Sequence, residues 1–229
     1  MSRFFVRPDS PEGWAAGLAS PSHWREGYSA YALAYTWHPS GGVPAKVSGL
    51  LSRSGIPSLR DVELIAGIPE YKVALPGGNT ASQTDLFALL RGSDGATIAM
   101  AVEGKAEEAF GDNTVAGWRK DASDGKKLRL RHLLSVLGLR DDERLGPVRY
   151  QLLHRTASAV IEAERLNADL AVMLVHSFSP TRRWFAELQR FLALYEVSLE
   201  GDGIVRLGEY RGRPLYVGWL SDVHPEAAA

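Results

Sequence analysis

The sequence predicts an α/β protein with a mixed central sheet, and three segments carry this prediction. Residues 84–105 hold two apolar runs around Gly92-Ser93-Asp94-Gly95, the pattern of a β-hairpin. Residues 170–176 form a continuous apolar run, typical of a central strand that is buried on both faces. Residues 148–167 repeat apolar side chains at helical spacing, which predicts an amphipathic helix between them. An antiparallel hairpin followed by a helical crossover makes the expected sheet mixed.

The composition fits one sizeable globular domain. The chain has 229 residues, of which 45% are hydrophobic and 23% are charged. There is no cysteine, so disulfides, thiol catalysis and thiolate zinc sites are excluded. The first residues contain no long apolar segment, and no apolar run approaches the roughly 18 residues of a membrane span. We therefore expect a cytoplasmic protein without a membrane partner.

The first third of the chain predicts helices before the sheet. Ser22 is the expected N-cap of a helix over residues 22–38, and residues 44–54 predict a second, short helix. Residues 58–66 predict a third helix, with Ser58 as its cap and Gly67 as its end. A short strand over residues 71–75 is expected next, before the turn at 76–79.

After the hairpin, residues 106–146 are polar and mixed, and they predict a helical insertion. Its expected helices cover residues 115–122 and 126–137. Residues 181–197 predict a further helix, residues 205–219 an edge hairpin, and 227–229 a frayed end. We expect a single domain over 1–229. Its parts are a helical N-terminal extension (1–57), a core (58–178) and a C-terminal helix with the edge hairpin (179–229).

The hairpin brings chemically active side chains together. A turn centred on Asp94 places Asp85 directly opposite Glu103, with Cβ atoms roughly 4.5–5.5 Å apart. Lys105 lies two residues beyond Glu103 and projects from the same face. Two opposed carboxylates destabilise a sheet, and a divalent cation such as Mg²⁺ would remove the conflict, with the Gly104 carbonyl as a further ligand. The alternative is a solvated Lys105–carboxylate pair, worth about 0–1 kcal/mol.

The alternation along the second hairpin strand favours a covered face. Ile98, Met100 and Val102 share one face, whereas the other carries Ala99, Ala101, Glu103 and Lys105. Small alanines that lead to an acid and a base indicate a face that packs against another element or admits a ligand.

Basic residues are concentrated between residues 119 and 155. Such a cluster is able to hold a phosphate backbone, although the net charge of −1 does not itself indicate a nucleic-acid-binding protein. Ordinary solvated helix faces explain the same residues equally well.

The predicted order of elements from residue 58 to 176 is helix, strand, strand, strand, helix, strand. With Asp85 on the second strand and Glu103-Gly104-Lys105 on the third, the chain resembles the PD-(D/E)XK nuclease superfamily. That superfamily has a restriction-endonuclease-like αβββαβ core with a mixed sheet. Several stretches are also similar to an uncharacterised bacterial family assigned to it: Pro69-Glu70-Tyr71, residues 81–85, residues 102–105, residues 149–155 and residues 175–178.

The resemblance implies roles for individual residues. Asp85 and Glu103 would bind the metal and Lys105 would be the catalytic lysine. A glutamate of the first core helix often completes the metal site, and Glu63 matches best, with Glu70 as the weaker candidate. The helix after the motif would contribute Gln151, and also Arg155. Two features depart from the family pattern: Thr84 stands where a proline is usual, and about 40 residues separate the third strand from the next helix.

These residues predict a Mg²⁺- or Mn²⁺-dependent phosphodiester hydrolase acting on nucleic acid, with DNA as the expected substrate. The alternative is a catalytically inactive scaffold that keeps the fold and binds nucleic acid or a protein, because a fold does not fix a function. A nuclease subunit targeted by a partner protein is a third interpretation. A homodimer is expected for cutting two strands.

Overall fold

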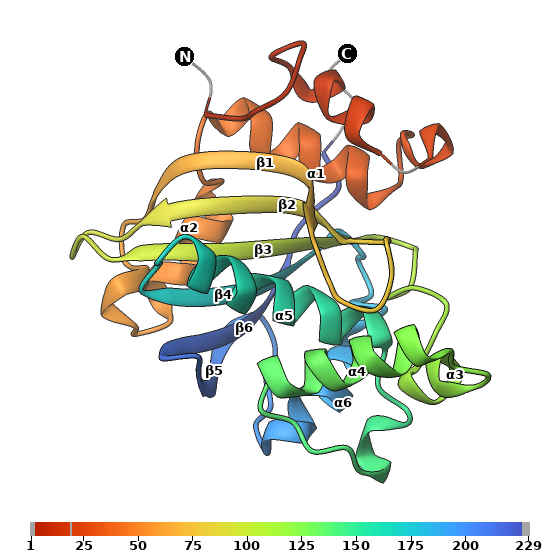
Figure 1. The fold of residues 1–229 in the computed structure, drawn as a ribbon. Coiled ribbons are helices and arrows are strands. Elements are labelled where there is room, and N and C mark those ends of the chain that lie inside the picture. The colour runs from red at the N-terminus through yellow and green to blue at the C-terminus, as the bar shows by residue number, and fades with distance from the viewer. Residues whose placement is uncertain (1–2, 19, 226–229) are drawn as a thin grey trace.

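One mixed sheet forms the centre of the protein. A computed structural model describes residues 3–18 and 20–225, and in this part of the chain the sheet has six strands in the order β1-β2-β3-β4-β6-β5 (Figure 1). The strands are β1 (Glu63–Val73), β2 (Ser82–Arg91), β3 (Thr97–Lys105), β4 (Leu170–Ser177), β5 (Gly203–Tyr210) and β6 (Arg213–Ser221).

The strand directions confirm the predicted α/β class with a mixed sheet. The β1, β2 and β3 strands are antiparallel neighbours, whereas β4 runs parallel to both β3 and β6. The edge strand β5 returns antiparallel to β6. The long crossover from β3 to β4 contains the helix that the amphipathic pattern predicted.

Helices cover both faces of the sheet (Figure 1). The helices α1 (Ser29–Trp37) and α2 (Ala45–Arg53) lie on one face, and α4 (Asp124–Val136), α5 (Tyr150–Arg165) and α6 (Phe185–Leu192) on the other. The short α3 (Val115–Arg119) precedes α4. The remaining helical segments are 3₁₀ helices, one of seven residues (Pro11–Gly17) and five of a single turn: Pro21–His23, His38–Ser40, Pro57–Leu59, Glu143–Leu145 and Ala193–Tyr195.

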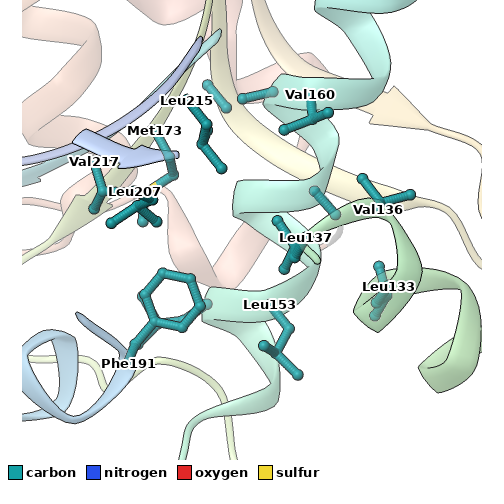
Figure 2. Close-up of a cluster of buried hydrophobic side chains, with 14 of the residues drawn as sticks. Leu133, Val136, Leu137, Leu153, Val160, Met173, Phe191, Leu207, Leu215 and Val217 are labelled. Atoms are coloured by element: carbon teal, nitrogen blue, oxygen red, sulfur yellow. The ribbon is translucent and has the colours of Figure 1, made fainter. Parts of the chain in front are cut away.

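Each face of the sheet has its own apolar core, as the alternation along β3 predicted. Ile98, Met100 and Val102 pack against α1 and α2, whereas Ala99 and Ala101 pack beneath α5. Figure 2 shows the second core, where Leu153 and Val160 of α5 meet side chains of α4, α6 and the strands. Alanines on β3 let α5 lie close to the sheet beside Glu103.

The first predicted helix starts later than expected. Ser22 lies in the 3₁₀ turn Pro21–His23, and α1 begins at Ser29 with Tyr28 in the N-cap position. The reason is Gly27, whose φ of +88° is incompatible with a continuous right-handed helix. The second predicted helix is confirmed as α2.

The helix predicted over residues 58–66 is wrong. Only Pro57–Leu59 forms a 3₁₀ turn, and the chain then enters β1, which includes residues 71–73 of the strand predicted at 71–75 and ends at Val73. Pairing with β2 overrides the helical propensity of this Leu- and Glu-containing segment. Phe4 also forms a parallel bridge with Gly67, and a Cβ at Gly67 would lie 2.5 Å from the Phe4 ring.

The remaining elements agree with the sequence prediction except at their ends. The hairpin, the helices of the insertion, α5 and β4 are confirmed, whereas α6 is shorter than the expected 181–197. The C-terminal hairpin exists, but only β5 is at the edge, because β6 pairs with β4. The frayed end expected at 227–229 lies outside the described residues. No helix of the described chain is long and apolar enough to span a bilayer.

We expect Leu153→Ala to destabilise the protein strongly. Leu153 is fully buried in the α5 core, and removing such a side chain costs about 2–5 kcal/mol. The matched control is Leu128→Ala on α4, where the side chain is 45% exposed and the cost should be well below 1 kcal/mol. Urea unfolding of both variants measures the difference, and equal losses would contradict this packing.

Candidate functional site

The strands β2 and β3 separate where the hairpin ends. Their pairing is regular from Arg91–Thr97 to Leu86–Val102, which confirms the predicted register and leaves Asp85 opposite Glu103. Beyond this point, the Gly104 main-chain N–H donates to the Asp85 carboxylate, at 2.8 Å from Oδ2. Asp85 therefore satisfies a main-chain donor of the neighbouring strand with its side chain.

Gly104 is required by the packing on the opposite face. A Cβ at this position would lie 2.5 Å from Cδ1 of Leu33 on α1. The absence of a side chain lets α1 approach the strand between Glu103 and Lys105.

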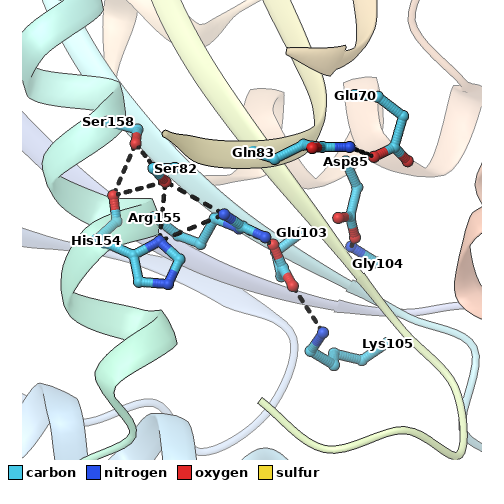
Figure 3. A network of polar contacts seen from close by, with 10 residues as sticks. All are labelled: Glu70, Ser82, Gln83, Asp85, Glu103, Gly104, Lys105, His154, Arg155 and Ser158. Carbon is cyan, nitrogen blue, oxygen red and sulfur yellow. Dashed lines mark hydrogen bonds and ion pairs between the residues drawn. The ribbon is translucent and has the colours of Figure 1, made fainter. Parts of the chain in front are cut away.

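Glu103 is the centre of a buried ion-pair cluster (Figure 3). One carboxylate oxygen lies 2.7 Å from Lys105 Nζ, and the other accepts from Arg155 Nε on α5. The Glu103 and Lys105 side chains are only 2% and 4% exposed. This burial contradicts the alternative of a solvated pair on an open strand face.

A second layer of hydrogen bonds holds Arg155 in place (Figure 3). Its Nη1 donates to Ser82 Oγ on β2, which also accepts from Ser158 Oγ one turn further along α5. His154 Nδ1 shares this hydroxyl at 2.8 Å. Burial and the adjacent Arg155 charge lower the pKa of His154 well below its usual value, so the ring remains neutral. His154 therefore serves as a neutral hydrogen-bonding partner of Ser82.

Glu70 is the third carboxylate of the cluster, and Glu63 is not part of it. Glu70 lies between Pro69 and Tyr71, which pair with Leu86 and Thr84, so it stands opposite Asp85. Its carboxylate accepts from Gln83 Nε2 at 2.6 Å. The prediction that Glu63 completes a metal site is wrong, because Glu63 pairs with Arg91 at the far end of β1 and forms an ion pair with Arg3. Six residues of strand separate Asp85 from Arg91, roughly 20 Å.

Negative charge exceeds positive charge in this cluster. Glu70, Asp85 and Glu103 face the cations Lys105 and Arg155. Burial and the Glu103 charge raise the pKa of Asp85 well above its usual value, and burial raises the pKa of Glu70 to about 7. The Arg155 and Lys105 charges keep the pKa of Glu103 low despite its burial. Glu103 is therefore ionised, whereas the raised pKa values of Asp85 and Glu70 mean that their ionised forms are disfavoured unless a further cation is present.

The cluster opens into a cavity of about 460 Å³. Its walls include the three acids, Lys105 and Arg155, together with Gln151 of α5 and the chain around Tyr28 and Ser29. Gln151 thus lies beside the cluster, as the resemblance implied. Its Oε1 atom is buried without a hydrogen-bond partner among the described residues.

The donor atoms suit a hard divalent cation, although the present side-chain arrangement does not complete a site. Nowhere in residues 3–18 and 20–225 do three His, Cys, Asp or Glu side chains stand where they could hold a metal together. Mg²⁺ commonly takes only one or two protein carboxylates and keeps several waters. Asp85 and Glu103 fit this donor set, with the Gly104 carbonyl as a further oxygen. Glu103 would then share its oxygens with Lys105 and Arg155.

Sequence reasoning ranked the third acid wrongly for a traceable reason. A helix over residues 58–66 favoured Glu63, whereas a strand through this segment would have placed Glu70 opposite Asp85. The contact of Arg155 with Glu103 required the docking of α5 on β3, which no sequence spacing specifies. The signal that did exist was the pair Gln151 and Arg155, four residues apart on one helix face.

The fold and cluster together define an α/β protein with a buried acid–base site on diverging strands. Residues 7–224 match the family described as a domain of unknown function, DUF6946, and the chain belongs to this family. No curated protein matches the chain. No solved structure matches it either.

We expect Asp85→Asn to stabilise the metal-free protein at alkaline pH. A carboxyl whose pKa is raised on folding contributes stability at low pH that is lost as pH rises from about 4 through the folded value, near 7 for Glu70. The amide keeps an acceptor for the Gly104 N–H but removes one excess charge. In EDTA at pH 8 we expect a gain of about 1–2 kcal/mol, or roughly 2–8 °C in Tm.

The gain should shrink at pH 5, because the raised pKa of Asp85 makes its neutral form more favourable as the pH falls. Glu63→Gln is the matched control, because this exposed carboxylate lies outside the cluster and should change Tm little at either pH. A loss of stability in Asp85→Asn that is the same at both pH values would contradict the proposed charge excess.

Proposed function

We propose that this protein is a divalent-metal-dependent phosphodiester hydrolase acting on nucleic acid, with DNA as the first substrate to test. The observation that carries the proposal is the buried Asp85, Glu103 and Lys105 cluster at the floor of a cavity. An ammonium group buried against a carboxylate and lining a cavity is a costly arrangement, and the adjacent Asp85, whose pKa burial raises, is the kind of group that concentrates at functional sites.

The order of elements gives independent support. The helix α2, the strands β1 to β3, the helix α5 and the strand β4 follow the αβββαβ order of restriction-endonuclease-like cores, with α3 and α4 as an insertion. The acids and the lysine lie on the second and third of these strands, where the PD-(D/E)XK superfamily carries its motif. With α2 as the first core helix, that helix does not supply the third metal-binding glutamate. The glutamate would instead be Glu70 on β1.

In this proposal Asp85 and Glu103 hold Mg²⁺ or Mn²⁺, and Glu70 adds a third carboxylate or binds one of the metal's waters. The bound cation would lower the pKa of a water and neutralise a phosphate oxygen. Lys105, held at 2.7 Å from Glu103, would donate to the nucleophile or to the developing charge on phosphorus. Gln151 and Arg155 on α5 would orient the phosphate from the other wall of the cavity.

One observation favours an inactive scaffold as the second candidate. Both Glu103 oxygens are already occupied by Lys105 and Arg155, so the cluster is partly neutralised by the protein itself. In a scaffold, these contacts would hold α5 on the sheet and the cavity would bind nucleic acid or a protein without cutting. Dependence on a divalent cation separates the two candidates.

We expect plasmid, linear duplex or single-stranded DNA to be cut with Mg²⁺ or Mn²⁺ and spared in EDTA. Lys105→Ala should reduce the rate at least about 100-fold, because it removes a charged donor to the transition state. Lys127→Ala on α4, where the side chain is 57% exposed, is the matched control and should cut normally. Gel electrophoresis of time courses measures the rates. Equal cutting by the two variants would show a contaminant, and no cutting on any substrate would favour the scaffold.

We also expect Mg²⁺ to raise Tm at pH 8, since a ligand that binds only the folded state stabilises it. The increase should disappear in Asp85→Asn and persist in Glu63→Gln, which leaves the cluster intact. Differential scanning fluorimetry with a Mg²⁺ titration provides the measurement. An identical Mg²⁺ response in both variants would place the cation elsewhere.

A further inference from the structure

We propose that a second cavity, lined by Trp118, Arg129, Tyr150 and Gln151, binds one unpaired nucleotide next to the acid cluster. The inference rests on the proposed function and specifies its substrate as nucleic acid with at least one nucleotide outside a duplex. The cavity measures about 360 Å³ and is formed by the insertion, α5 and the loop that leads into β2.

The two cavities are adjacent and share part of their walls. Five residues line both of them: Gln83, Gly111, Asp112, Gln151 and Arg155. A chain whose phosphate lies at Asp85 and Glu103 would therefore have its neighbouring nucleotide at the second cavity. The volume lies within the roughly 300–1,000 Å³ range of small-ligand pockets.

The second cavity has the opposite charge to the first. Arg129 and Arg155 line it with one carboxylate, that of Asp112, and His154 is neutral. The first cavity is lined by five carboxylates of Glu and Asp and by two cations, Lys105 and Arg155. Arg129 is only 6% exposed and is held by the main-chain oxygens of residues 75, 76 and 78. The N-terminus of α5 has no side-chain cap, but its Tyr150 N–H donates to the main-chain oxygen of Asn113. The fixed Arg129 guanidinium therefore remains as the group that favours an anion such as a phosphate.

Unpartnered polar atoms point to recognition of a base edge. Trp118 Nε1 is a buried donor and Gln151 Oε1 a buried acceptor, and neither has a hydrogen-bond partner in the described chain. Leaving such groups unpaired costs about 1–3 kcal/mol each. A nucleobase carries both donors and acceptors on its edge, so one ligand would satisfy both.

The packing of the Trp118 ring also favours contact of a ligand with the edge of the indole rather than with its face. The Trp118 and Tyr150 rings stack with centroids 3.9 Å apart at 8°, and the Lys126 ammonium lies 4.8 Å from the Trp118 ring centroid. Both ring faces are thus covered, which leaves the indole N–H edge for a ligand. A base within a duplex has its pairing edge occupied and lies in the stack, so only an unpaired base would enter.

The test measures binding without cleavage. A fluorescein-labelled 12-nucleotide single strand of mixed sequence and its duplex are titrated with the protein in EDTA, and anisotropy reports Kd. We expect the single strand to bind at least tenfold more tightly than the duplex. Trp118→Phe, which keeps the stack but removes the N–H, should weaken single-strand binding about fivefold or more.

Trp184→Phe is the matched control, because Trp184 Nε1 is likewise buried without a partner but does not line this cavity. It should bind like wild type. Gln151→Leu is the second variant, used if Trp118→Phe loses its near-ultraviolet circular dichroism, and it should weaken single-strand binding similarly. Normal single-strand binding by a folded Trp118→Phe or Gln151→Leu, or tighter binding of the duplex, would overturn the proposal.

The result is independent of the hydrolase activity. Trp118-dependent binding by a protein that cuts nothing would sustain the nucleotide site and count against the hydrolase. Cutting that proceeds with Trp118-independent binding would sustain the hydrolase and overturn the nucleotide site.

Discussion

The burial of the Glu103 carboxylate is the constraint on which this part of the structure depends. A charge in that position is tolerated only with good partners, and removing one partner of a buried pair costs about 3–5 kcal/mol. Lys105 comes from the same strand, but Arg155 must be delivered by α5. The docking of α5 over Ala99 and Ala101, and the Ser82, His154 and Ser158 hydrogen bonds that hold the guanidinium, follow from this requirement.

The site exists because β2 and β3 stop pairing beside the buried Glu103. If regular pairing continued past Leu86 and Val102, the opposed Asp85 and Glu103 would repel each other within a closed sheet. The strands instead part, and Asp85 turns to the Gly104 N–H. Gly104 makes this possible because Leu33 of α1 occupies the space of its missing side chain. The N-terminal helices are therefore part of the site, since they back the strand and line the cavity mouth near Tyr28 and Ser29.

Much of this arrangement could be predicted from local sequence patterns, whereas the rest depends on how the helices pack on the sheet. The hairpin register could be predicted because a turn cluster and period-two alternation fix which residues face each other. The α5 helix and the β4 strand could likewise be predicted from the spacing of their apolar residues. Residues 58–66 were predicted as a helix because Ser58 resembles an N-cap and Gly67 a helix end, whereas pairing of β1 with β2 decides the structure of this segment. Because of that error, Glu63 rather than Glu70 was predicted as the third acid of the site. The Arg155 contact and the stack of Trp118 on Tyr150 arise where the insertion packs on α5, which no local pattern specifies.

The signs of the charges distinguish a site from a structural ion network. A network that only ties α5 to the sheet would be served by Glu103 with Lys105 and Arg155, which already balance to one positive charge. Asp85 and Glu70 would reverse that balance once ionised, but burial raises the pKa of both, and the Glu103 charge raises that of Asp85 further. A further cation would favour the ionised form of these acids, and the buried Arg129 guanidinium in the adjoining cavity would favour an anion. The metal ion and the phosphate chain that we propose as ligands would satisfy both at once. A neutral or purely cationic ligand would leave one of the two cavities with its charge unmet.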